Sequence, residues 1–551
     1  RKRNIMFGPI SDVVPSTPIF EMYPLGFMTI VSYLKKYNLE VRIINLALKM
    51  LLQSNLNVEK LIKSLNPLSF GLSLHWLPHV HGCLNIAQLI KKYHPQTPII
   101  VGGISASYYH QELISLPYID FVIKGDSAEK PLKELILAIK EKKEFNSIPN
   151  LTWKNKNEIK VNKFSCVPTK LNIQFDYLEM IKGVIKYKDP YGYFPFKDWF
   201  KYPITAILPF KGCLHNCAFC GGGEKAFQKI NNRKHLACRP VELLVKDIYK
   251  SSNLFNAPII ILGDLHQAGK SYIQDFFNLI AKKKITNHII FELFAPTSSD
   301  YFKLLSNAIP NYSLQISPET HDEEIRQILG KPYSNTSLEK TISSALKFNC
   351  SRIDIFFIIG LPKQDKNSVL ETLNYCEELI KKFPDKKVHP YIAPLAPFLD
   401  PGSILFENPE KYGYKLFAHS LNDHYQLLEK SSWKDMLNYE TKWLNRNDLV
   451  EITYKASFEL NEIKKKYGLI NEKEYLNLKK QINLSLLLIE KFDKIKEQKN
   501  ENKNFFKKNL ISNNICVKKR LEWSKGIIQF NWYQIFKSII LGDKNGNNRR
   551  I

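Results

Sequence analysis

The sequence lacks several features that would place it among membrane, secreted or disordered proteins. No stretch of about 18 consecutive apolar residues occurs, so we expect no transmembrane segment. No charged-then-apolar segment opens the chain, so we expect no secretory signal and a cytoplasmic protein. The hydrophobic fraction of 44% and the charged fraction of 24% are those of a folded globular protein, which excludes global disorder.

Acidic residues are scarce relative to basic ones. The chain has 53 Asp and Glu against 79 Lys and Arg, which gives a net charge of +26. Such an excess favours phosphates, anionic lipid heads or other acidic partners through long-range attraction. A compositional bias toward Lys and Asn, visible at residues 499–504, explains the same excess without any partner. Because residues 415–551 contain no recognisable RNA-binding module, a nucleic-acid partner is open but not favoured.

The cysteines do not suggest a disulfide framework, because their number is nine and no secretory signal accompanies them. Cys213, Cys217 and Cys220 fall within eight residues as a CxxxCxxC motif. Three thiolates on one loop can bind three irons of a cubane cluster, which leaves the fourth iron open to a substrate. A structural zinc site is the alternative, with its fourth ligand taken from His215, His235 or Cys238.

Short β-branched runs alternate with helical patterns in the first part of the chain. The expected strands lie at residues 4–8, 40–46, 68–74, 97–103 and 120–125. Strands without polar alternation, separated by helices, predict a doubly wound parallel sheet that is covered on both faces. Its ligand is expected outside the carboxyl ends of the strands.

A second alternating series follows, and the end of the chain is helical. The six strands of this series are expected at residues 204–210, 257–263, 288–294, 311–317, 352–360 and 387–396. Six βα units predict a partial barrel with its chemistry at the C-terminal strand ends. Beyond residue 415 no strand is predicted, and residues 449–467 and 472–498 have the pattern of amphipathic helices.

The chain is therefore predicted to be an α/β protein with four parts. These are a doubly wound Rossmann-like domain at 1–145, an irregular aromatic connector at 146–200, a partial (β/α)6 TIM-like barrel at 201–410 and a helical C-terminal region at 411–551. We expect the aromatic residues of the connector to line the domain interface. Substrate contacts are expected in residues 185–200 and in the C-terminal helices.

The cysteine motif, with an aromatic residue before its third cysteine at the end of the first barrel strand, resembles the radical S-adenosylmethionine (SAM) enzymes. The resemblance covers about residues 200–400. It implies a [4Fe–4S] cluster held by Cys213, Cys217 and Cys220, whose open iron binds the amino and carboxylate groups of SAM. One electron from an external flavodoxin-like or ferredoxin-like donor then cleaves SAM to methionine and a 5′-deoxyadenosyl radical.

The same resemblance implies further SAM contacts. Gly221 and Gly222 follow the third cysteine, where glycine lets the backbone approach a ligand closely. Asp264 stands where the family commonly has a Gly-Gly-Glu motif, and Glu319 ends the fourth strand. Gly360 opens a Gly-Leu-Pro element like that of the core shared by methylthiotransferases and the Elongator catalytic subunit, although a plain turn also suits Gly and Pro there.

A doubly wound domain before such a core resembles the B12-binding domain of cobalamin-dependent radical SAM enzymes. The cobalamin contacts that this implies follow the third, fourth and fifth strands: Ser73, His75, Gly102, Gly103, Ser105 and Gly125. The best-known B12 domains carry Asp-x-His-x-x-Gly after the first strand, and here residues 8–15 contain no His. The lower cobalt ligand is therefore unassigned, with His75, His79 and His81 nearby as neutral imidazoles or as polar residues that open a helix.

The resemblance implies an enzyme that methylates an unactivated carbon of a small-molecule or lipid substrate, with SAM used both as methyl source and as radical source. Carbon–carbon bond or ring formation without methyl transfer is the close alternative. A tRNA-modifying enzyme and a non-catalytic protein that binds zinc and cobalamin are the more distant ones.

Overall fold

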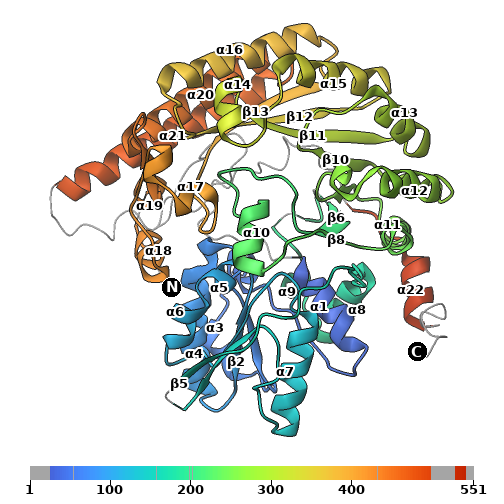
Figure 1. Cartoon of the computed structure of the whole chain (residues 1–551), viewed down its shortest axis with the longest axis vertical. Coiled ribbons are helices and arrows are strands. Elements are labelled where there is room, and N and C mark those ends of the chain that lie inside the picture. Colours follow the sequence, from blue (N-terminus) through green and yellow to red (C-terminus); the bar gives the residue numbers. More distant parts are fainter. Residues whose placement is uncertain are drawn as a thin grey trace.

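The computed structural model describes residues 25–497 and 528–540, apart from positions 54, 157, 198, 202, 397 and 431. Two bodies built on parallel strands lie one below the other in Figure 1, with α10 (Glu224–Asn231) between them. The strand predicted at residues 4–8 and the loop at 8–15 lie outside the described residues. No described helix is both long and apolar enough to cross a membrane.

The first sheet has the order β1-β2-β3-β4-β5, and its three parallel strands coincide with predicted ones. Its strands are β1 (Phe70–Ser73), β2 (Ile99–Gly102), β3 (Phe121–Ile123), β4 (Leu151–Asn155) and β5 (Glu158–Val161). Ser73 pairs with Gly102, which pairs with Ile123, so the three carboxyl ends meet at one edge of the sheet. The ligand edge expected for this domain therefore exists.

Two parts of the first body differ from the sequence prediction. Residues 40–46 form no strand and lead into α2 (Leu46–Leu52), because no described strand lies beside them. The antiparallel strands β4 and β5 fall in the segment predicted to be an irregular connector. They form because Leu151 and Trp153 of β4 are buried in one hydrophobic cluster with Phe121 of β3. By pairing with β3, strand β4 covers an edge that would otherwise be open.

Helices cover the first sheet, and α4 (Val80–Tyr93) shows how an apolar helix face is buried against it. In α4 the buried residues include Val80, Cys83, Leu84 and Ala87, the spacing of one helix face. The other elements here are α1 (Gly26–Lys35), α3 (Val58–Lys63), η1 (Leu77–His79), α5 (Ile104–Tyr108), α6 (His110–Ser115) and α7 (Glu129–Glu141).

The second sheet confirms the predicted six-stranded series. Its order is β13-β12-β11-β10-β9-β6, with every neighbouring pair parallel. The strands are β6 (Thr205–Ile207), β9 (Ile259–Ile261), β10 (Ile289–Leu293), β11 (Tyr312–Glu319), β12 (Ile353–Ile359) and β13 (Val388–Pro394). A small pair, β7 (Phe210–Lys211) and β8 (Ala237–Cys238), follows β6.

The outer layer of the second body consists of helices that join consecutive strands. They are α11 (Val241–Leu254), η2 (Leu265–Ala268), α12 (Lys270–Ala281), α13 (Ser299–Ala308), α14 (Glu323–Ile328), α15 (Asn335–Lys347) and α16 (Lys366–Lys382). Because consecutive strands are neighbours, their carboxyl ends form one continuous edge, the place predicted for the chemistry.

The connector and the C-terminal region pack against both bodies. Connector helices α8 (Tyr177–Tyr187) and α9 (Pro190–Tyr193) belong to a core cluster that joins Met28 of α1 to Ile290 of β10 through Trp199. The C-terminal elements are α17 (Ile404–Glu407), η3 (Glu410–Tyr412), β14 (Tyr414–Leu416), α18 (Leu421–Leu427), α19 (Trp433–Met436), β15 (Tyr439–Thr441), α20 (Arg446–Lys466), α21 (Glu472–Glu497) and α22 (Trp532–Ile540). The short antiparallel pair β14-β15 contradicts the prediction of no strand beyond 415, because three residues are too few to show a periodic pattern.

Two buried ion pairs link the bodies. The Arg233 guanidinium binds both carboxylate oxygens of Asp126, at 2.5 and 2.9 Å, and its side chain is 2% exposed. Lys211 Nζ lies 3.3 Å from Glu129 Oε1 and donates to the Asp126 carbonyl at 2.6 Å. Both cations come from the segments that flank the cysteine motif, and both acids follow β3. We call these four residues the interdomain clamp.

Arg233→Ala is expected to destabilise the protein by about 3–5 kcal/mol, because it leaves the Asp126 carboxylate buried without its partner. The measurement is the apparent free energy of unfolding in urea. Lys382→Ala is the matched control, since it removes an ion pair of 2.5 Å whose lysine is 57% exposed, and about 1 kcal/mol or less should be lost. Equal losses in the two variants would contradict the role of the clamp.

Candidate active site

A cavity of about 2270 Å³ lies between the two bodies. Ser73 and Gly102 line it from the carboxyl edge of the first sheet, and Cys213, Cys217 and Glu319 line it from the second body. Pockets for single small ligands usually measure about 300–1,000 Å³. The volume includes an apolar end formed by α1 and α3. Leu25, the first described residue, lines that end, and the site considered below is the part of the cavity between the two sheets.

The three cysteines of the motif face this cavity from one loop. All three line it, and all three are free, partly exposed thiols. The His215 amide donates to Cys213 Sγ at 3.4 Å, and the Gly222 amide donates to Cys220 Sγ at 3.3 Å. Backbone amides aimed at sulfur stabilise thiolates, which is the form that binds iron.

Neighbouring segments fix the cysteine loop. The Ala218 amide donates to the Leu329 carbonyl at 3.0 Å, and the Ala218 carbonyl accepts from the Leu405 amide at 3.0 Å. Gly330 has a φ of +82°, and a Cβ on it would lie 2.6 Å from the Asn216 carbonyl oxygen. Glycine at 330 therefore allows two loops to touch through their backbones.

Burial opposes the formation of thiolates in the cysteine loop unless positive charge lies beside them. Burial raises the pKa of each of the three thiols, that of Cys220 to about 12. Deprotonation of all three in so buried a place requires compensating positive charge, which irons bound by the thiolates supply. Lys331 also opposes the rise of the pKa at Cys213 and Cys217.

Lys331 forms a buried ion pair at the cavity wall. Its Nζ lies 2.5 Å from Glu319 Oε1 and donates to the Ser317 carbonyl at 2.6 Å. Glu319 adopts a φ of +68°, a strained conformation for a residue with a Cβ. Burial works to lower the pKa of Lys331, but Glu319, Cys217 and Tyr333 together outweigh it and the pKa is raised, so the cation persists beside the cysteine loop.

Three thiols on one loop that faces the cavity are the donor set of a cubane cluster, in which each thiolate binds a different iron. Among the described residues, no group of three or more His, Cys, Asp or Glu side chains is arranged to hold a metal ion. Gln267 lines the cavity, and its Oε1 accepts from the Leu214 amide at 2.7 Å. Its buried Nε2 has no hydrogen-bond acceptor among the described protein atoms, and it lowers the pKa of Cys213 by its proximity. An amide donor in this position suits the sulfur atoms of a cluster. The alternative zinc ligands His215, His235 and Cys238 all lie outside the cavity lining. The His215 ring meets the Phe294 ring edge-on, and Cys238 of β8 pairs with Phe210 of β7.

The structure brings some of the predicted SAM residues to the cavity and not others. Glu319 and Gly222 line it. The Gly221 amide instead donates to Asp400 at 3.2 Å. Asp264 is 1% exposed, and its two carboxylate oxygens accept from His266 and from the Phe294 amide. Gly360 has a φ of +99° and packs against the hydroxyl of Tyr439, which accounts for glycine at that position.

Glu292 of β10 is a cavity residue that the sequence reasoning missed. It lines the cavity beside Gly263 and accepts a hydrogen bond from the Gly263 amide at 2.5 Å. Burial raises the pKa of Glu292. A sequence signal existed, because Glu292 is the lone charge in the otherwise apolar strand Ile289–Leu293. Lys331 and Gln267, by contrast, stand in segments with no pattern that distinguishes them.

The predicted cobalamin residues converge on the same cavity with one exception. Ser73, His75, Gly102, Gly103 and Gly125 line it. Gly103 has a φ of +121°, and a Cβ there would lie 2.5 Å from the His75 backbone. Ser105 lies behind this edge, where its amide and hydroxyl both donate to the His75 carbonyl.

The rest of the lining bears on where a substrate binds. Connector residues Tyr187 and Phe196 line the cavity, whereas the described lining extends no further along the chain than Lys331. The connector part of the predicted substrate surface is therefore at the site. The described C-terminal helices are not part of this lining.

Comparisons with known proteins agree with this geometry. The B12 binding domain model matches residues 12–136, and the Radical SAM superfamily model matches residues 207–376. An uncharacterized protein of Methanocaldococcus jannaschii is 24% identical over 192 residues, which are 34% of this chain and 39% of that protein. The matched part thus spans about two fifths of that relative.

Two solved structures share the fold. The radical SAM methyltransferase TsrM of Kitasatospora setae, with cobalamin and a [4Fe–4S] cluster bound, is 14% identical with a TM-score of 0.57, and the match covers 82% of this chain and 87% of that one. The cobalamin-dependent radical SAM enzyme OxsB, with aqua-cobalamin bound, is 15% identical with a TM-score of 0.57, covering 85% of this chain and 70% of that one.

Replacement of any one of Cys213, Cys217 and Cys220 by Ala is expected to abolish the cluster and SAM cleavage, since each thiolate binds its own iron. Cobalamin binding should survive, because the other body supplies its contacts. Iron content, 5′-deoxyadenosine formation and bound cobalamin are measured on each variant after anaerobic reconstitution. Cys238→Ala, outside the cavity lining, is the control that should retain the cluster. Retained SAM cleavage in all three variants would contradict the assignment.

The two family models coincide with the two bodies that enclose the cavity. The predicted cobalamin contacts fall within residues 12–136, and the cysteine motif falls within residues 207–376. The cofactors of this protein are therefore a [4Fe–4S] cluster, SAM and cobalamin. The chain therefore combines a B12 binding domain with a domain of the Radical SAM superfamily.

Proposed function

We propose that this enzyme is a methyltransferase that acts on an unactivated carbon of a small-molecule or lipid substrate. The observation that carries the proposal is that both cofactor edges open into one cavity, so a substrate between them is within reach of both. When bound, the cluster and SAM supply a hydrogen-abstracting radical, and cobalamin carries the methyl group. A substrate held between the two cofactors can meet both kinds of chemistry without leaving the cavity.

Charged residues at the cavity wall match the polar groups of SAM. Lys331 presents a buried cation beside Cys217, and we assign it to the SAM carboxylate. Glu292 presents a carboxylate on the same wall, and we assign it to the SAM ammonium group. Asp264, which the sequence analysis expected to contact SAM, already has both carboxylate oxygens bonded within the protein.

The solved relatives and the cysteines support the remaining parts of the proposal. TsrM is a methyltransferase whose structure with tryptophan and a SAM analogue has a TM-score of 0.51 to this chain, at 12% identity, with 65% of this chain and 70% of that chain covered. A small-molecule substrate is consistent with that fold. The eight cysteines within the described residues are all free, as expected in a reducing compartment. We also propose a cytoplasmic location. A flavodoxin-like or ferredoxin-like electron donor is part of the proposal because the cleavage of SAM requires one electron.

Anaerobic incubation with cobalamin, SAM and a one-electron reductant is expected to yield both 5′-deoxyadenosine and S-adenosylhomocysteine. The first product reports radical generation and the second reports methyl transfer from SAM. Mass spectrometry of the SAM products is the measurement, with the Cys217→Ala variant as the control that should lose 5′-deoxyadenosine. If a substrate turns over while S-adenosylhomocysteine stays absent, the enzyme forms bonds or rings without methyl transfer and the proposal is wrong.

Glu292→Gln is expected to raise the KM for SAM about tenfold to a hundredfold, because a hydrogen bond to a charged group contributes about 1.5–3 kcal/mol. The amide oxygen of Gln can still accept from Gly263, so the fold should be retained. The KM is read from 5′-deoxyadenosine formation at varied SAM. Glu339→Gln, which removes a carboxylate from the outer helix α15, is the matched control. An unchanged KM in Glu292→Gln would overturn the assignment.

A further inference from the structure

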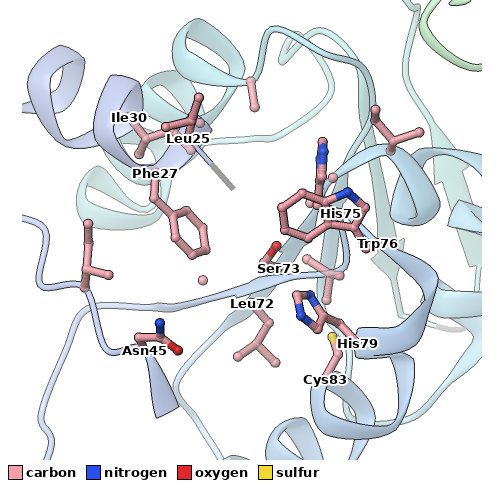
Figure 2. Close-up of a pocket in the computed structure, with 18 of the residues that line it drawn as sticks. Leu25, Phe27, Ile30, Asn45, Leu72, Ser73, His75, Trp76, His79 and Cys83 are labelled. Carbon is pink, nitrogen blue, oxygen red and sulfur yellow. The ribbon is translucent and has the colours of Figure 1, made fainter. Parts of the chain in front are cut away.

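Three histidines follow β1, and the structure separates them. Figure 2 shows His75, Trp76 and His79 along one side of the pocket, with Phe27 on another. His81 stacks on Tyr425 at a centroid distance of 3.9 Å, and its Nε2 lies 3.3 Å from Glu429, so its ring belongs to the contact between α4 and α18.

His79 and His75 differ in their surroundings. The His79 ring lies edge-on to Trp76 at 5.7 Å, and it has a further interaction of its own. The His75 ring meets Trp76 edge-on at 4.8 Å, and its nitrogens have no hydrogen-bond partner among the described residues. His75 also lines the cavity between Ser73 and the Gly103 backbone. A polar ring that faces a cofactor cavity in this way has donor and acceptor capacity to give to a ligand.

The His75 backbone is fixed by its neighbours. Its carbonyl accepts from the Ser105 amide at 3.3 Å and from the Ser105 hydroxyl at 3.1 Å. A Cβ on residue 103 would lie 2.5 Å from both the Cα and the backbone nitrogen of His75, so the Gly103 backbone packs directly against His75. The imidazole is therefore attached to a rigid point at the carboxyl edge of the sheet, where a doubly wound domain binds its ligand.

The charge state of His75 suits metal ligation. Burial, His79 and Lys211 together lower its pKa to about 4, so the ring is neutral at physiological pH. A neutral imidazole has a free lone pair on one nitrogen, and this is the form that binds metals. Lys211 belongs to the interdomain clamp, so its effect on the pKa of His75 comes from the second body.

We propose that His75 is the protein ligand to the cobalt of cobalamin, on the side that faces the first sheet. The inference rests on the proposed function only in that cobalamin binds in this cavity. It places the axial ligand after β1, on a strand edge shared with Ser73 and Gly102, and not on the loop at residues 8–15, which contains no His.

The test is electron paramagnetic resonance of the Co(II) state of the enzyme reconstituted with cobinamide, which lacks the nucleotide base of cobalamin. Any nitrogen splitting must then come from the protein. We expect a three-line splitting on the cobalt lines, which changes to two lines when the protein is labelled with ¹⁵N-histidine. This measurement needs no variant and no turnover.

Variants then identify the residue. His75→Ala and His75→Gln should each bind cobinamide and lose the nitrogen splitting, while His79→Ala should keep it. The side chain of His75 carries none of the backbone contacts that hold the loop, so both variants are expected to fold. Removal of the nitrogen ligand should also make Co(II) easier to reduce, which a shifted midpoint potential would report.

The possible outcomes distinguish this inference from the proposed function. If cobinamide binds without nitrogen splitting in the unmodified enzyme, or if the splitting persists in His75→Ala, the inference is overturned and the cobalamin site remains. If neither cobinamide nor cobalamin binds, both the inference and the proposed function fail.

Discussion

The interdomain clamp is the constraint on which the site depends, because neither body encloses the cavity alone. Asp126 and Glu129 follow β3 at the carboxyl edge of the first sheet, and Lys211 and Arg233 flank the cysteine motif in the second body. Two buried cation–carboxylate contacts therefore join the turn that follows β3 directly to the segments that flank the cysteine motif. Buried pairs of this kind are costly when broken, so the relative position of the two bodies is fixed by electrostatics as well as by packing.

Around this clamp, close backbone approach shapes most of the site. Gly330 lets the loop after α14 touch the cysteine loop, and Gly103 lets the start of α5 touch the His75 backbone. Most side chains that line the cavity are apolar, and Glu292, Glu319 and Lys331 are charged residues that the second body contributes to it. A mostly apolar enclosure with a small number of placed charges is typical of a cofactor site, because the charges orient the ligand while the walls exclude water.

The parallel architecture was predictable from the sequence because its signal is local. Strands such as Ile353–Ile359 and Ile289–Leu293 are apolar apart from one acidic residue each. They show no polar alternation, and this pattern can be recognised without knowing the neighbouring strand. The hairpin of β4 and β5 and the pair β14-β15 were missed because their short strands form only where a neighbour already exists. Residues 40–46 show the reverse case, a strand-like pattern with no described strand beside it.

The candidate site also has features that the sequence predicts and features that only the tertiary structure decides. The sequence by itself determined the cysteine motif, the two α/β bodies and the edges where ligands bind, since these depend on spacing and hydrophobic periodicity along the chain. Only the tertiary structure decided which acid faces the cavity. The carboxylate oxygens of Asp264 accept hydrogen bonds from His266 and from the Phe294 amide. Glu292, and not Asp264, lines the cavity. That choice depends on how neighbouring strands and loops satisfy each buried oxygen, which is a property of residues distant in sequence and adjacent in space.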